Sequence, residues 1–188
     1  MGLYLLRHCV THNNVKKIFT GRIDMEICEN QEIDFNGLTI PSKAIIFCSS
    51  MIRCRQTAKL LYAHILAAEE IHYCELLLER CFGIFEGMSK VAVQNEYPWF
   101  FSDGEFNFLQ TPPDGESYEE FCQRIVLFWT KYSIASLAKH QDVLIITHSN
   151  VLKVITRMYL NERLFEKSRI ANFINGRVYN LTAIEDNK

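Results

Sequence analysis

The sequence has no long hydrophobic run and no signal for export. The chain of 188 residues is 48% hydrophobic and 22% charged, and charge interrupts each apolar stretch. None reaches the roughly 18 residues that a membrane-spanning helix needs. The amino-terminal segment also lacks the basic region and cleavage site of a signal peptide. We therefore expect one cytoplasmic domain over residues 1–188, without a membrane partner.

Paired cysteines and a surplus of basic residues are also missing. The seven cysteines contain no C-x-x-C pair, and their odd number argues against a closed disulfide framework. No group of cysteine and histidine has the spacing of zinc ligands. The net charge of −2 offers no broad basic face for nucleic acid. Any bound anion must therefore be held by a few local positive groups.

Two apolar runs each end in a histidine. Residues 2–6 lead into Arg7 and His8, and residues 143–146 lead into Thr147 and His148. In an open α/β sheet, ligands bind outside the carboxyl ends of the strands. Two such strands in one sheet would bring both imidazoles and the Arg7 guanidinium to one anion.

Strand and helix patterns alternate along most of the chain. We expect strands at about 2–7, 44–48, 71–77 and 143–147, and helices at about 51–67, 117–139 and 150–160. Ser117 and Glu120 form the capping box that opens the second helix. Near the end, Asn175 and Gly176 separate residues 170–174 from 177–184 and predict an antiparallel hairpin. The alternation predicts an α/β sandwich with a mostly parallel sheet.

Six short segments carry polar and charged residues at the expected ends of these elements. They are Arg7–Asn14, Gly21–Asp24, Ser49–Ala58, Leu78–Gly87, Pro112–Ser117 and Thr147–Lys153. In this order the segments resemble the histidine phosphatase superfamily, the phosphoglycerate-mutase-like group, along almost the whole chain. The resemblance implies a three-layer α/β/α sandwich with a mostly parallel central sheet and a small cap at about residues 82–113. It also implies phosphoryl transfer through a histidine.

The resemblance implies a role for five catalytic residues. His8 becomes a phosphohistidine, which requires a neutral imidazole whose other nitrogen donates to a backbone carbonyl. Arg7, Arg53 and His148 surround the phosphoryl group, whose equatorial oxygens carry the charge. Glu79 donates a proton to the leaving alkoxide, so it must be kept protonated by burial or by a nearby phosphate.

Further residues of the same segments complete the expected site. The substrate-binding set is Arg7, Thr11, Asn14, Arg22, Arg53, His148 and Ser149. Because side chains supply the positive charge and no carboxylate cluster suits magnesium, we expect neither a metal nor a cofactor. The competing carboxylate, Glu86, lies in a segment that the family uses structurally. Arg55 is expected to face solvent, and no motif supports a role for His12, His64, His72 or His140.

The chain departs from the family pattern next to both histidines. Cys9 stands where glycine is expected, and Ser149 and Asn150 stand where two small residues are usual. Because glycine permits a close backbone approach, Cys9 is expected to narrow the phosphate cradle and lower activity. One alternative is therefore a catalytically impaired protein that binds phospholigands.

Rival enzyme classes receive less support. Cys74 and Arg80 have the C-x5-R spacing of cysteine-dependent phosphatases, but the leucines and glutamates between them suit a strand rather than an anion-binding loop. The segment from Met88 to Pro112 is too short for the substrate-binding insertion of cofactor-dependent mutases. We therefore favour a phosphatase for a small phosphorylated metabolite, with a mutase as the alternative. The aromatic residues of this cap either favour a ring-bearing leaving group or pack on one another (Phe100, Phe101, Phe106 and Phe108).

Overall fold

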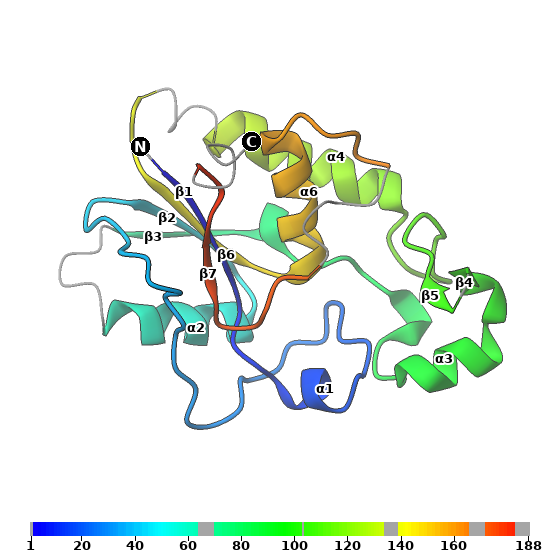
Figure 1. The fold of residues 1–188 in the computed structure, drawn as a ribbon. Helices are drawn as coiled ribbons and strands as arrows, with labels where there is room; N and C mark the ends of the chain where they lie inside the picture. Colours follow the sequence, from blue (N-terminus) through cyan, green and yellow to red (C-terminus); the bar gives the residue numbers. More distant parts are fainter. Residues whose placement is uncertain (1, 64–69, 103, 134–138, 166–171, 183–188) are drawn as a thin grey trace.

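One mixed sheet forms the centre of the molecule (Figure 1). The computed structural model describes residues 2–63, 70–102, 104–133, 139–165 and 172–182. Within them, the sheet has the order β3-β2-β6-β1-β7, made by β1 (Leu3–Arg7), β2 (Ile45–Ser49), β3 (Ile71–Cys74), β6 (Val143–Thr147) and β7 (Val178–Asn180). All pairings are parallel except that of β1 with β7. The prediction of a mostly parallel sheet is confirmed.

Helices and short turns connect these strands. The α-helices are α1 (His12–Val15), α2 (Ile52–Tyr62), α3 (Lys90–Glu96), α4 (Tyr118–Phe128) and α6 (Ser149–Tyr159). The 3-10 turns are η1 (Glu75–Leu77), η2 (Gly83–Phe85) and η3 (Pro98–Phe100), and the π-helical turn η4 (Trp129–Ser133) extends α4. A small hairpin pairs β4 (Phe101–Ser102) with β5 (Glu105–Phe106).

Side chains of β1 alternate between two buried clusters. Leu3 and Leu5 belong to the cluster that contains residues of α4 and α6, whereas Tyr4 and Leu6 belong to the cluster that contains residues of α2. The two sets of helices therefore cover opposite faces of the sheet (Figure 1). This is the three-layer arrangement that the sequence predicts. Because helices cover both faces of the sheet, the strands are almost continuously apolar.

The predicted strand at 71–77 is wrong in its second half. β3 ends at Cys74, and residues 75–77 form the 3-10 turn η1, which buries Leu77. A short apolar run does not distinguish a strand from a buried helical turn. The helix predicted at 51–67 is described to Tyr62, and the end of the helix predicted at 117–139 lies partly outside the described residues.

The predicted carboxy-terminal hairpin is also wrong. Residues 172–174 form no strand, while 170 and 171 lie outside the described residues, and β7 pairs with β1 instead. The turn is tied to the end of β1, because Gly176 N donates to Arg7 O at 2.9 Å. Asn175 and Gly176 therefore form a turn as predicted, but that turn leads the chain onto the central sheet.

The cap that precedes α4 has an aromatic core of its own. Phe85 and Phe100 are fully buried, and their ring centroids lie 4.9 Å apart at 85°. Phe106 packs on Phe100 with centroids 4.8 Å apart. Arg80 holds the segment that leads from this cap to α4, since its guanidinium donates to the carbonyls of Phe108, Gln110 and Glu116. Phe85, Phe100 and Phe106 therefore pack on one another, whereas Phe108 packs on Tyr118 of α4 with ring centroids 4.9 Å apart.

No helix in the described part of the chain has both the length and the apolar character needed to cross a membrane.

Candidate active site

The two predicted histidines meet at one edge of the sheet. β1 and β6 are parallel neighbours with Arg7 paired to Thr147, so His8 and His148 follow adjacent strand ends. His8 N donates to Thr147 O at 3.0 Å. The two ring centroids lie 5.2 Å apart with an interplanar angle of 59°. The topology therefore brings together side chains that are 140 positions apart in the sequence.

His8 has the hydrogen bond that a nucleophilic imidazole requires. Its Nδ1 lies 2.8 Å from the carbonyl oxygen of Cys9, which can only accept a proton. This contact places the ring proton on Nδ1 and leaves the lone pair of Nε2 available. Burial, together with the positive charges of Arg53 and Arg7, keeps the pKa of His8 well below its ordinary value. His8 is therefore neutral in the free protein at neutral pH.

Arg7 and Arg53 place two guanidinium groups beside this imidazole. Arg7 donates through Nη1 to the carbonyl of Phe173 at 2.8 Å, while its buried Nε has no hydrogen-bond partner in the part of the chain that the structure describes. Arg53 is 1% exposed and donates through its two terminal nitrogens to the carbonyls of Ile23 and Gly21, each at 2.8 Å. A buried N–H without a partner is costly, so Arg7 Nε marks a place for an acceptor.

His148 lies between two polar side chains. Arg53 Nε donates to its Nδ1 at 3.2 Å, and Ser49 Oγ lies 3.0 Å from its Nε2. Burial and the charge of Arg53 keep the pKa of His148 well below its ordinary value. The sequence motif contains Ser49 at the end of β2, but no role for it could be read from the motif alone.

The two candidate carboxylates have different environments. Glu79 is 8% exposed, and its Oε1 accepts from Arg80 N at 2.8 Å while its Oε2 accepts from Asn150 N at 3.5 Å. Glu86 accepts through Oε1 from the backbone N–H groups of Arg22 and Phe82. Glu86 thus joins two loops, in line with the structural role expected for it. Glu79 instead contacts the first turn of α6, the helix that directly follows His148.

Thr11 and Asn14 form a capping box at the start of α1. Asn14 Oδ1 accepts from the backbone N–H and the hydroxyl of Thr11, and also from Asn175 Nδ2 at 3.2 Å. Asn175 Nδ2 also donates to the carbonyl of His8 at 2.8 Å. The two residues therefore order the loop that carries His8. The hydrogen bonds given to the Asn14 side chain all use Oδ1, so its Nδ2 is not part of the capping box.

Arg22 and Ser149 lie at the margin of this cluster. Arg22 forms an ion pair with Glu116 at 3.3 Å and donates through Nε to Glu79 O at 3.4 Å. Ser149 is the first residue of α6, directly after His148. The amino terminus of α6 therefore adds oriented backbone N–H groups to the positive side chains.

Lys153 is a charged residue near the site that the sequence analysis did not assign to it. It lies one helical turn after Ser149 on α6 and is half-buried. Burial lowers the pKa of its ammonium group, against the opposing effect of the Glu79 charge. Its position four residues after Ser149 on one helix was the available signal.

Cys9 does not behave as an obstruction. Its backbone lies outside the left-handed region where glycine is favoured, and its side chain is 1% exposed within the cluster on the α2 face of the sheet. Its backbone N–H donates to Thr57 Oγ1 at 2.9 Å. These contacts direct the Cys9 side chain into the core, and they give no support to the expectation of a narrowed cradle.

Other residues lie where the sequence analysis placed them. Arg55 is exposed and covers the Tyr73 ring at 4.9 Å. His12, His72 and His140 are exposed, and His64 lies outside the described residues. Within the described part of the chain, no cluster of three or more His, Cys, Asp or Glu side chains is placed to hold a metal ion.

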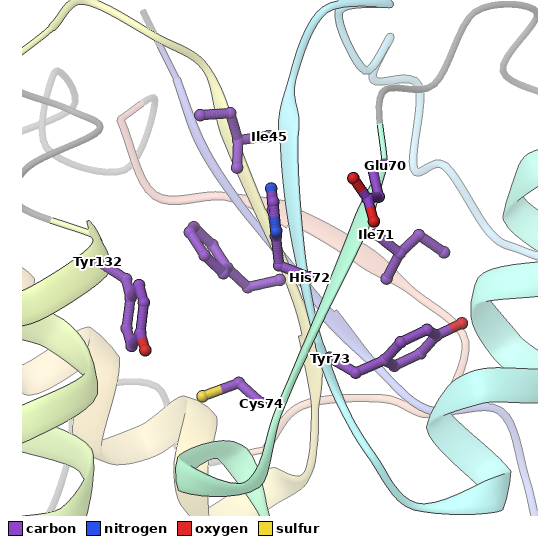
Figure 2. A pocket seen from close by; sticks show the side chains of 8 residues that line it. Ile45, Glu70, Ile71, His72, Tyr73, Cys74 and Tyr132 are labelled. Atoms are coloured by element: carbon purple, nitrogen blue, oxygen red, sulfur yellow. The ribbon is translucent and has the colours of Figure 1, made fainter.

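A cavity of about 580 Å³ lies elsewhere, at the β3 edge of the sheet (Figure 2). It is lined by residues of β2, β3 and η4 and contains none of the predicted site residues (Ile45, Phe47, Glu70, Ile71, His72, Tyr73, Cys74 and Tyr132). Glu70 is its one formal charge, which would repel an anion. Cys74 lines this cavity and burial raises the pKa of its thiol, whereas Arg80 binds carbonyls of the cap. The C-x5-R pair therefore does not form an anion-binding loop.

Comparison with known families agrees with this geometry. The family model "Histidine phosphatase superfamily (branch 1)" matches residues 3–187. The chain belongs to the histidine phosphatase superfamily. A "Probable phosphatase" of Schizosaccharomyces pombe is 27% identical, with 98% of this chain and 87% of that protein aligned. A "2,3-bisphosphoglycerate-dependent phosphoglycerate mutase" of Cytophaga hutchinsonii is 28% identical, with 81% of this chain and 74% of that protein aligned.

Solved structures of other proteins share the fold. YhfR of Bacillus stearothermophilus matches with a TM-score of 0.74 and 24% identity, covering 95% of this chain and 89% of that one. A putative alpha-ribazole-5'-P phosphatase of Escherichia coli matches with a TM-score of 0.67 and 22% identity, covering 87% of this chain and 81% of that one. The phosphoglycerate-mutase-like fold expected from the sequence is thereby confirmed.

Proposed function

We propose that this histidine phosphatase superfamily protein hydrolyses a small phosphate monoester through a phosphohistidine on His8. The observation that carries the proposal is the state of the His8 ring. Its Nδ1 is held by the Cys9 carbonyl, so Nε2 is free to attack beside the buried guanidinium of Arg53 and the half-buried guanidinium of Arg7. The unpartnered Nε of Arg7 supplies a donor for a phosphoryl oxygen.

In the first step, His8 Nε2 forms a bond to phosphorus while the bond to the ester oxygen breaks. Arg7, Arg53 and the amide of Asn14 hold the phosphoryl oxygens, and the first turn of α6 adds its N–H groups. The leaving alkoxide takes the proton of Glu79, whose two oxygens receive the backbone N–H groups of Arg80 and Asn150. The negative phosphoryl group next to Glu79 favours the protonated carboxyl.

In the second step, water attacks phosphorus and the bond to His8 Nε2 breaks. Glu79, now a carboxylate, accepts a proton from the water, because the acid of one step is the base of the reverse step. The products are inorganic phosphate and neutral His8. No group outside the described cluster has to gain or lose a proton over the full cycle.

The short cap favours hydrolysis over transfer to a second substrate. The segment before α4 is occupied by α3, η3 and the β4-β5 hairpin, and its aromatic side chains fill its own core. A mutase must protect the phosphohistidine from water until an acceptor arrives, which requires additional covering structure. The mutase remains the second candidate because curated relatives of both kinds match the chain.

The covalent step provides the decisive test. Wild-type protein, His8→Ala and the exposed-histidine control His12→Ala are assayed with p-nitrophenyl phosphate in the presence of EDTA. We expect turnover by wild type and His12→Ala, and none by His8→Ala. After rapid quenching, wild type should carry acid-labile, alkali-stable phosphate on His8. Label on a cysteine, or activity retained by His8→Ala, would contradict the mechanism.

A further inference from the structure

The contacts of His148 define the position of its ring proton. Arg53 Nε lies 3.2 Å from His148 Nδ1, and a guanidinium can donate a hydrogen bond but never accept one. Nδ1 must therefore be the acceptor. In a neutral imidazole the proton then lies on Nε2, which is 3.0 Å from Ser49 Oγ. Ser49 consequently accepts this proton in a hydrogen bond.

Ser49 is itself held in place. It is the last residue of β2, fully buried, and its backbone belongs to the pairing with β3. The thiol of Cys54 lies beside the same contact, with its Sγ 3.6 Å from His148 Nε2. Burial raises the pKa of Cys54 to about 12, so this group stays a neutral thiol. Arg53, His148 and Ser49 thus form one chain of hydrogen bonds, with Cys54 next to it.

The two histidines have opposite tautomers as a result. His8 carries its proton on Nδ1, held by the Cys9 carbonyl, whereas His148 carries its proton on Nε2, held by Ser49. His8 therefore keeps a free lone pair on Nε2, whereas both ring nitrogens of His148 have fixed partners, and the two ring centroids lie 5.2 Å apart. The hydrogen bonds to Arg53 and Ser49 thereby hold the His148 ring in one orientation beside the nucleophile.

We propose that Ser49 is a positioning residue, which together with Arg53 fixes His148 as the neutral Nε2–H tautomer opposite the nucleophile. The catalytic consequence rests on the proposed function, but the tautomer itself is a property of the resting protein. The sequence motif begins at Ser49 but gives it no role. Its neighbour Ser50 is half-buried at the bend before α2, and the hydroxyl hydrogen-bonded to His148 is that of Ser49, so Ser50 provides a matched control.

The tautomer is measured by long-range proton–nitrogen correlation spectra of protein labelled with ¹⁵N-histidine, with His148→Gln to assign the signals. We expect the wild-type spectrum to show His148 as the Nε2–H form and His8 as the Nδ1–H form. An Nδ1–H form of His148 would overturn the proposal. This result does not depend on turnover, so it stays separate from any failure of the proposed function.

Kinetics of three variants test the consequence. Ser49→Ala removes the oxygen acceptor of the His148 Nε2–H and leaves only the weaker contact with Cys54 Sγ, so kcat should fall on the order of tenfold with KM much less affected. Ser49→Thr keeps the hydroxyl and should recover both kcat and the His148 signals, while Ser50→Ala should match wild type. Wild-type kcat and spectra in Ser49→Ala, or equal losses in the Ala and Thr variants, would refute a positioning role.

Discussion

Glu79 and Glu86 show how position decides the role of chemically identical side chains. Both carboxylates accept backbone N–H groups, but Glu79 reaches the first turn of α6 after His148, whereas Glu86 joins Arg22 to Phe82. In the proposed mechanism Glu79 is therefore the carboxylic acid that protonates the ester oxygen of a phosphoryl group held by His8. A proton donor in this position matters more as the leaving group becomes a stronger base.

Glu79→Gln should therefore lose activity selectively. With an alkyl phosphate we expect a fall in kcat/KM of about 10²–10⁴, the usual contribution of general acid catalysis. With p-nitrophenyl phosphate, whose phenolate leaves without protonation, the fall should be clearly smaller. Steady-state kinetics on both substrates give the ratio, and Glu86→Gln serves as the control. Equal losses on both substrates would assign Glu79 to structure, and a selective loss in Glu86→Gln would identify it as the acid.

Cys9 shows that a departure from a family pattern can be neutral in geometry. Its backbone does not adopt the left-handed conformation, and its side chain fills the core on the α2 face. The position therefore does not need the conformational freedom of glycine. The hydrogen bond that matters to His8 uses the carbonyl of Cys9, which every residue type supplies.

At the scale of elements, α1 connects the site to the fold through its cap. Thr11 and Asn14 close the capping box, and Asn175 binds both Asn14 Oδ1 and the carbonyl of His8. α4 begins with a second capping box, formed by Ser117 and Glu120. The two boxes have similar chemistry, but only the first contacts the His8 loop.

This difference gives a paired prediction. Thr11→Ala and Ser117→Ala should each lower the free energy of unfolding by about 0.5–2 kcal/mol, the usual cost of losing a side-chain cap. Only Thr11→Ala should also lower kcat/KM, because Asn14 and the His8 carbonyl lose their support. Urea unfolding and phosphatase assays on both variants measure the two effects. A similar loss of activity in Ser117→Ala would mean that α1 has no special connection to the site.

The sequence predicted these elements where the signal was local and failed where it was not. The Ser117 capping box and the Asn175-Gly176 turn depend on neighbouring residues, and both are present. The partner of the strand after that turn depends on the whole sheet, and the hairpin prediction was wrong. Likewise, the motif predicted the convergence of His8 and His148, whereas the contact of Ser49 with His148 depends on the register of β2 against β6.

At the scale of the whole molecule, burying two neutral histidines has a cost that depends on pH. The folded protein keeps the pKa of His8 and His148 well below the ordinary value of 6.5, because burial and the neighbouring arginines oppose a further charge. Below that value an unfolded histidine binds a proton that the folded one does not. Protons then favour the unfolded chain, so stability rises with pH through this range and falls as pH falls below about 6.5.

Replacing one of these histidines should reduce that dependence. One group that is neutral when folded and has its ordinary pKa when unfolded loses about 1.4 kcal/mol between about pH 7.5 and 5.5. The decrease in unfolding free energy over this interval should therefore be smaller by about that amount in His8→Gln and in His148→Gln than in wild type. Asp34 and Glu120, whose pKa values are lowered by hydrogen bonds to Arg177 and Ser117, affect stability only at lower pH. Urea unfolding at the two pH values decides the matter: a pH dependence in both variants as steep as in wild type would mean that these imidazoles take up protons in the folded protein.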